Sequence, residues 1–136
     1  MPRKTDSKNP ADWLLISESD LSGIAALAKQ ELAYDMVRSK LAEVLEKILK
    51  AELLRLGWAL VKTHDVLVLA KELEVRGSDL MSDVKPLAIA LAGTYFIARY
   101  PGFDLEDPDW PEFRAKLAQA EKLLITVKAR LPQPKS

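Results

Sequence analysis

Residues 34–56 read YDMVRSKLAEVLEKILKAELLRL, and this stretch decides the fold class. At about 100° per residue, most of its apolar side chains fall on one broad stripe, as in a helix that is buried along one side. We therefore expect a long helix from Ala33 to Leu56 that forms the spine of an all-α fold. Its core-facing stripe consists of Val37, Leu41, Val44, Leu45, Ile48, Leu49, Ala51 and Leu56.

The opposite side of this predicted helix is charged. Glu43 precedes Lys47 by four residues and Glu46 precedes Lys50 by four, which is the spacing of ion pairs along a helix. When exposed, such pairs stabilise a helix by only about 0.3–0.5 kcal/mol each. We therefore expect a solvated polar face that is available for recognition.

The end of the helix departs from this pattern. Glu52 and Arg55 fall near the middle of the apolar stripe, whereas Leu53 and Leu54 point toward the polar side. Buried surface is therefore expected all around this end.

Composition limits the class of protein. A chain of 136 residues with 49% hydrophobic content is sufficient for one domain with its own core. It contains no cysteine and one histidine, which excludes cysteine redox chemistry and a thiolate or histidine-rich metal centre on one chain. We expect no metal and no cofactor.

The charges are balanced, because lysines and arginines number 20 and so do aspartates and glutamates. The protein as a whole thus lacks the positive field of a nonspecific nucleic-acid binder. No stretch approaches the roughly 20 apolar residues that are needed to cross a bilayer. We expect a soluble, cytoplasmic protein that does not bind membranes.

Two helix ends carry clear local signals. Asn9 is a candidate N-cap, and Pro10 suits the first position of a helix that continues to about Lys29. Gly57 suits the left-handed position after the C-terminus of the long helix.

Three more helices are predicted. Thr63 or His64 is nearest the cap of the first, with Asp65 in its first turn, and this short helix ends before Arg76. Ser82 is expected to cap the next, which has Pro86 within its first turn. The helices are predicted to run from Thr63 or His64 to the residue before Arg76, from Ser82 to about Arg99, and from Pro108 or Trp110 to Leu131.

No run of residues alternates apolar and polar side chains as a strand would. Short connections make sequential helices antiparallel neighbours. We predict an antiparallel up-and-down bundle of four long helices plus one short helix. Residues 1–10 would form a flexible arm, 11–131 the bundle and 132–136 a tail.

The order of three short motifs resembles the HEPN domain family. They are EKILKA at 46–51 on the long helix, KTHD at 62–65 opening the short helix, and RYP at 99–101 leaving the fourth. The resemblance covers about residues 12–131. Members of this family are helical bundles of prokaryotes and some eukaryotes, often encoded beside a minimal nucleotidyltransferase of the MNT type, and many are toxin ribonucleases of toxin-antitoxin pairs. The resemblance implies a prokaryotic bundle that forms homodimers and packs near a nucleotide- or RNA-handling site.

The chain departs from the ribonuclease members of that family. They carry a histidine four to six positions after an arginine, whereas His64 here lies nine positions after Arg55 and no histidine follows Arg99. Metal-independent RNA cleavage needs a group that exchanges a proton near neutral pH, and arginine cannot serve as that base. We therefore expect a noncatalytic protein, with a divergent ribonuclease that uses His64 with Arg99 or Arg55 as the alternative.

The candidate site combines the residues of these motifs. Each has a simpler structural interpretation, as a helix-start residue, a solvated ion pair or a helix end. In the functional interpretation the cluster receives phosphate or an acidic side chain of a partner, with nucleotide or RNA as candidate ligands. The apolar surplus near Leu53, Leu54 and Trp58 would bury against another chain. The candidate binding residues are Glu46, Lys47, Lys50, Lys62, His64, Asp65, Arg99 and Tyr100.

Overall fold

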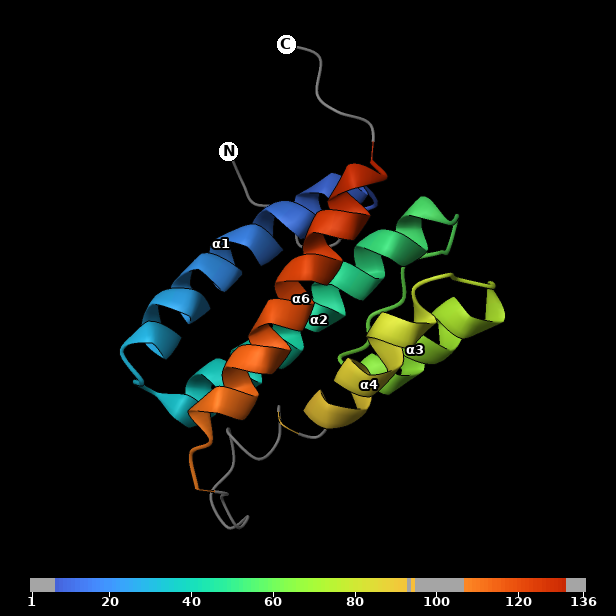
Figure 1. Ribbon diagram of the computed structural model, residues 1–136. Coiled ribbons are helices and arrows are strands. Elements are labelled where there is room, and N and C mark those ends of the chain that lie inside the picture. The colour runs from blue at the N-terminus through green and yellow to red at the C-terminus, as the bar shows by residue number, and fades with distance from the viewer. Residues whose placement is uncertain (1–6, 93, 95–106, 132–136) are drawn as a thin grey trace.

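The computed structural model describes residues 7–92, 94 and 107–131, and within these ranges every regular element is a helix. The predicted all-α class is confirmed. Among the described residues, none of the helices has the length and apolar character needed to span a membrane. The helices are α1 (Pro10–Lys29), α2 (Tyr34–Arg55), α3 (Val66–Val75), α4 (Met81–Leu91) and α6 (Trp110–Ala129), drawn in Figure 1.

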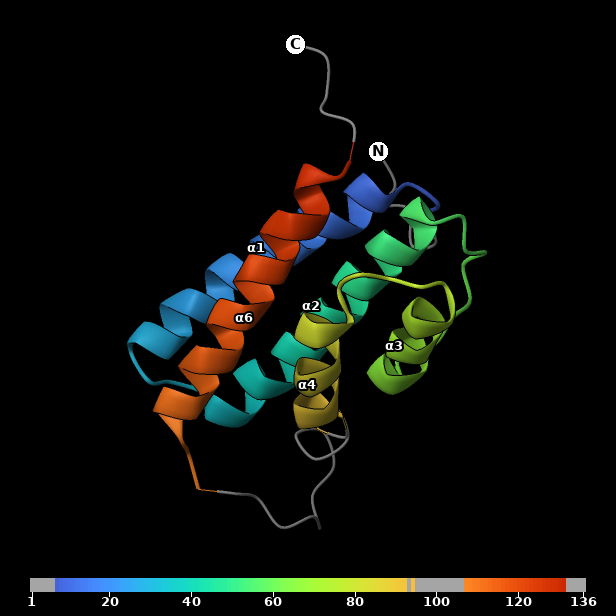
Figure 2. The same ribbon diagram turned by 45° about the vertical axis from the view of Figure 1, so that its right-hand side comes forward.

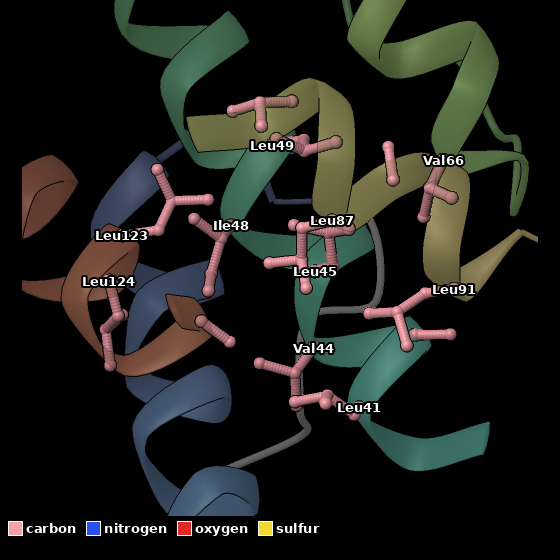
Figure 3. Packing of buried hydrophobic residues seen from close by; sticks show 14 of the residues in the cluster. Leu41, Val44, Leu45, Ile48, Leu49, Val66, Leu87, Leu91, Leu123 and Leu124 are labelled. Carbon is pink, nitrogen blue, oxygen red and sulfur yellow. The ribbon is translucent and has the colours of Figure 1, made fainter. Parts of the chain in front are cut away.

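The long helix α2 lies at the centre of the arrangement. It contacts α1, α3, α4 and α6, with α1 and α6 on one side and the α3–α4 pair on the other (Figures 1 and 2). Its side chains point toward Leu123 and Leu124 of α6 and also toward Leu87 and Leu91 of α4 (Figure 3). The predicted core stripe of α2 is therefore correct at seven of its eight positions, whereas Leu56, the C-cap of α2, is only partly buried. The stripe residues Val37, Leu41, Val44, Leu45, Ile48, Leu49 and Ala51 are all buried.

Local capping chemistry fixes two helix ends as predicted. The Asn9 side chain accepts a hydrogen bond from the backbone N–H of Ala11, and Pro10 is the first residue of α1. Gly57 has a φ of 88°, in the left-handed region that favours glycine. The backbone N–H of Trp58 then closes the end of α2 by donating to the carbonyl of Leu53 at 2.9 Å.

Two predicted caps are wrong. The N-cap of α3 is Asp65, because its Oδ1 accepts from the backbone N–H groups of Leu67 and Val68. Helix α4 begins at Met81 after Leu80, so Ser82 lies inside the helix and does not cap it. The N-cap Leu80 is 4% exposed and makes no side-chain cap, and its carbonyl accepts from the backbone N–H groups of Asp83 and Val84.

The helix lengths also differ from the prediction. Helices α1, α2 and α6 have 20, 22 and 20 residues, whereas α3 has 10 and α4 has 11. The predicted fourth helix up to Arg99 is therefore too long, because α4 ends at Leu91 and the backbone of Ala92 is extended. Residues 93 and 95–99 lie outside the described residues. Pro86 is not in the first turn but is the sixth residue of α4, where its ring nitrogen removes one backbone hydrogen bond of the helix.

The predicted solvated face of α2 is wrong at its two most informative positions. Glu46 is 6% exposed and Lys50 is 4% exposed. Because α2 has neighbours on more than one side, the segment before α3 and Trp13 of α1 reach this part of its surface. Lys47 remains half-buried.

The prediction of buried surface all around the far end of α2 is correct only in part, because Arg55 is exposed and Leu54 and Leu56 are partly buried. Leu53 is fully buried and Trp58 is 7% exposed. These side chains are covered by the chain itself, however, so the expectation that they bury against another chain is wrong. Only Leu54 of that group is half-buried.

Candidate functional site

A chain of polar contacts connects the interior of the bundle to its surface. The buried Nζ of Lys50 donates to Oε2 of Glu46 at 2.8 Å, and Nδ1 of His64 lies 3.1 Å from Oε1 of the same carboxylate. A carboxylate only accepts hydrogen bonds, so Nδ1 carries the proton in this contact. The side chain of Glu46 is 8% exposed, whereas that of His64 is 70% exposed. Glu46 thus holds the imidazole in one orientation at the surface.

Helix α1 contributes to the same cluster. The Nζ of Lys50 lies 5.2 Å from the centre of the Trp13 ring, a cation–π geometry. The indole Nε1 of Trp13 in turn donates to the backbone carbonyl of Ser7 at 2.8 Å. Residues preceding α1 are therefore tied to the buried ion pair through one aromatic ring.

A cavity of about 540 Å³ opens beside His64. Helix α2 supplies one wall, the segment before α3 and the first residues of α3 supply another, and the end of α4 contributes apolar side chains. Asp65 is fixed on this wall because it caps α3. The lining residues are Ala42, Glu43, Glu46, Lys62, Thr63, His64, Asp65, Val66, Leu67, Leu91 and Ala92.

The structure brings together half of the predicted site residues. Glu46, Lys62, His64 and Asp65 all line the cavity. Lys50 does not line it but supports Glu46 from the interior. Sequence reasoning missed Glu43 as a lining residue, although its position one helical turn before Glu46 could have indicated it.

The remaining predicted site residues lie away from the cavity or outside the described residues. Lys47 lies 3.8 Å from the carboxylate of Asp20, on the side of α1. Arg99 and Tyr100 lie outside the described residues. Among the residues the structure describes, no group of three or more histidine or acidic side chains is arranged to hold a metal ion.

Within one chain, the structure does not bring Arg55 and His64 together, as the alternative of a divergent ribonuclease that uses these two residues would require. Arg55 lies nine residues after Glu46 on α2, which corresponds to about 13 Å along the helix axis. Its Nε donates to Glu52, which is 1% exposed. His64 is beside Glu46, so the two groups that this version of a ribonuclease would need are separated.

A second network of charges at the end of α2 has a structural role. Arg130, which follows α6, donates to both carboxylate oxygens of Asp79 at 2.9 and 2.8 Å and reaches Glu52 at 3.3 Å. The hydrogen bonds from Arg130 lower the pKa of Asp79, and the same bonds raise the pKa of Arg130. This network connects α6 and the α3–α4 turn to α2.

These observations define an all-α helical bundle with a cavity beside its central helix. The family model of the HEPN domain matches residues 10–130, which covers every described helix. The chain therefore belongs to the HEPN domain family, as its motifs indicated. Comparison with curated proteins found no match, and comparison with solved structures found none either.

Proposed function

We propose that this chain is a noncatalytic HEPN-type binding protein. In this proposal it acts in the cytoplasm as a homodimeric partner of a minimal nucleotidyltransferase, in a toxin-antitoxin or nucleotide-binding role. The observation that carries the proposal is the environment of the sole histidine. His64 follows no arginine at the spacing of the family's ribonucleases, and a buried carboxylate holds it beside a cavity.

The charges around the cavity favour binding over RNA cleavage. Cleavage requires cationic groups that stabilise the negative charge of the reacting phosphate. Lys62 is the cation among the lining residues, whereas Glu43, Glu46 and Asp65 are acidic. The two lysines of α2 that were expected to receive phosphate are occupied, since Lys50 pairs with Glu46 and Lys47 lies near Asp20.

Exposed apolar side chains on α3 and α4 support association with another chain. Val75 is 72% exposed, Ile89 is 61% exposed, and Leu67 and Val68 are each nearly half exposed. Leu67 and Ile89 line one groove between α3 and α4, and exposed apolar surface of this kind is typical of interaction sites. They replace Leu53 and Trp58 as the candidate contact surface.

The central experiment measures RNA cleavage and partner binding on the full chain. Purified protein should leave single-stranded RNA intact in the absence of added metal. It should sediment as a dimer, and it should co-purify with a minimal nucleotidyltransferase encoded beside it. Cleavage that disappears in His64→Ala would instead establish the alternative, a divergent metal-independent ribonuclease. A monomer in sedimentation would refute the dimer.

A further inference from the structure

We propose that the groove between α3 and α4 binds an amphipathic helix of a different chain, one that carries acidic residues beside its apolar side chains. The inference rests on the proposed function for the existence of a partner, and it adds which surface meets that partner and with what chemistry. Leu67 lines both this groove and the cavity beside His64. A helix bound in the groove would therefore lie at the edge of that cavity.

Helix α3 is apolar on its outer side as well as on its inner side. It packs against α2 and α4 at the edge of the bundle (Figures 1 and 2). Its inner side chains are buried, whereas Leu67, Val68 and Val75 are exposed. Helices that are apolar all round are normally buried on all sides. The described helices leave the outer side of α3 uncovered, so its second apolar face favours contact with another chain.

The groove has a floor of small residues between larger apolar side chains. Ala70 of α3 and Ala88 of α4 are buried, and Leu67, Met81 and Ile89 line the groove beside them. Its volume of about 280 Å³ lies below the 300–1,000 Å³ that is typical of small-molecule sites. A row of apolar side chains from a partner fits such a shallow groove better than an enclosed ligand does. Amphipathic helices bind grooves in this way.

The rim of the groove carries an excess of positive charge. The Nζ atoms of Lys71 on α3 and Lys85 on α4 lie 3.2 and 3.6 Å from the two carboxylate oxygens of Glu74. These three are the charged residues among the described lining, so one carboxylate serves two ammonium groups. The lysine side chains are 69% and 63% exposed, within reach of a partner. A carboxylate on the bound helix would balance the second cation.

The same charge argues against a second copy of this chain as the occupant. A two-fold symmetric contact brings the same surface of both subunits together. Two such grooves would then face each other, each with an excess of positive charge, and juxtaposed like charges oppose association. An acidic helix removes this repulsion. The occupant is therefore a different chain, and the homodimer of the proposed function uses another surface.

The experiment is a titration of the full chain, followed by backbone amide NMR, with two synthetic helical peptides. Both peptides carry leucines at helical spacing along one face, and the positions beside the leucines are glutamate in one peptide and lysine in the other. We expect saturable shifts confined to α3 and α4 with the glutamate peptide, and about fivefold weaker binding of the lysine peptide. Added salt should narrow this difference, because it screens exposed charges.

Substitutions in the groove separate its apolar and charged contributions. Ile89→Ser removes an apolar side chain from the groove and should weaken binding of the glutamate peptide about tenfold. Ile125→Ser on α6 is the matched control and should bind as the parent does, because Ile125 is 68% exposed and Ile89 is 61% exposed. Combining Lys71→Gln with Lys85→Gln leaves the Glu74 carboxylate as the charge of the rim, and it should reverse the preference toward the lysine peptide.

Four results would overturn the inference. They are the absence of saturable shifts at α3 and α4 with the glutamate peptide, equal affinity for the two peptides, equal losses in the two isoleucine variants, or a homodimer that Ile89→Ser dissociates. The last would make this face the contact between copies of the chain.

Failure of this inference is distinguishable from failure of the proposed function. If the homodimer and the nucleotidyltransferase complex form while the groove binds neither peptide, only the inference fails. RNA cleavage that His64→Ala abolishes would reject the proposed noncatalytic role and leave the peptide result unchanged.

Discussion

Replacing Lys50 by methionine tests whether the ion pair between Lys50 and Glu46 is buried in the folded protein. Methionine keeps most of the side-chain length but leaves the Glu46 carboxylate, 8% exposed, without its cation. Removing one partner of a buried pair typically costs about 3–5 kcal/mol. His64 still donates to Glu46, so we expect the lower end, about 3 kcal/mol. With a urea m-value of about 1.5–2 kcal/mol/M, this lowers the unfolding midpoint by about 1.5–2 M.

The chain contains a matched control for this change. Lys116 donates to Glu112 at 2.7 Å with the same four-residue spacing, but the Glu112 side chain is 56% exposed. Exposed pairs contribute about 0.2–1 kcal/mol, so Lys116→Met should shift the urea midpoint by about 0.5 M or less. Equal, small shifts for Lys50→Met and Lys116→Met would refute the burial of the Glu46 pair and restore the solvated face that the sequence suggested.

Three further predictions concern single residues. Asp65→Ala removes the cap of α3 and should lower the free energy of unfolding by about 1 kcal/mol in urea denaturation, whereas Asp65→Asn should cost much less. Gly57→Ala places a side chain at a φ of 88° and should destabilise by about 1 kcal/mol, with a change near zero counting against the left-handed helix end. Because Arg130 lowers the pKa of Asp79 in the folded state, Asp79 contributes stability above its ordinary pKa of 3.8 and loses it as the pH falls below that value. Urea denaturation should therefore separate Asp79→Asn from the parent more strongly at pH 7 than at pH 2.5, and a difference of the same size at both pH values would contradict the contact with Arg130.

The features that could be predicted from sequence are those that depend on neighbouring residues. Asn9, Pro10 and Gly57 act through contacts within a few residues, so the ends of α1 and α2 followed from local chemistry. The start of α4 did not, because its N-cap is Leu80, an apolar residue that offers no capping side chain and so leaves no local signal of the kind that Ser82 suggested.

The candidate site was predictable in its residue types but not in its arrangement. His64 and Glu46 are 18 positions apart, and no periodicity specifies that they touch. A single helix also cannot show how many neighbours cover it. The charged spacing of Glu46 and Lys50 suits a solvated face, and burial beside Trp13 and His64 arises only from tertiary packing.

The two buried carboxylates of α2 show why Glu46 is the functional candidate of the pair. Glu52 receives Arg55 of the same helix and Arg130, which follows α6 and so joins α6 to α2. Both are guanidinium cations, which stay charged at all ordinary pH values. Glu46 receives one buried lysine and the exposed imidazole of His64, which lines a cavity. A change at Glu52 therefore alters the packing of helix ends, whereas a change at Glu46 also alters the orientation of a side chain that lines the cavity. We therefore predict that any binding at the cavity depends on Glu46 through His64, whereas the stability of the bundle depends on both carboxylates.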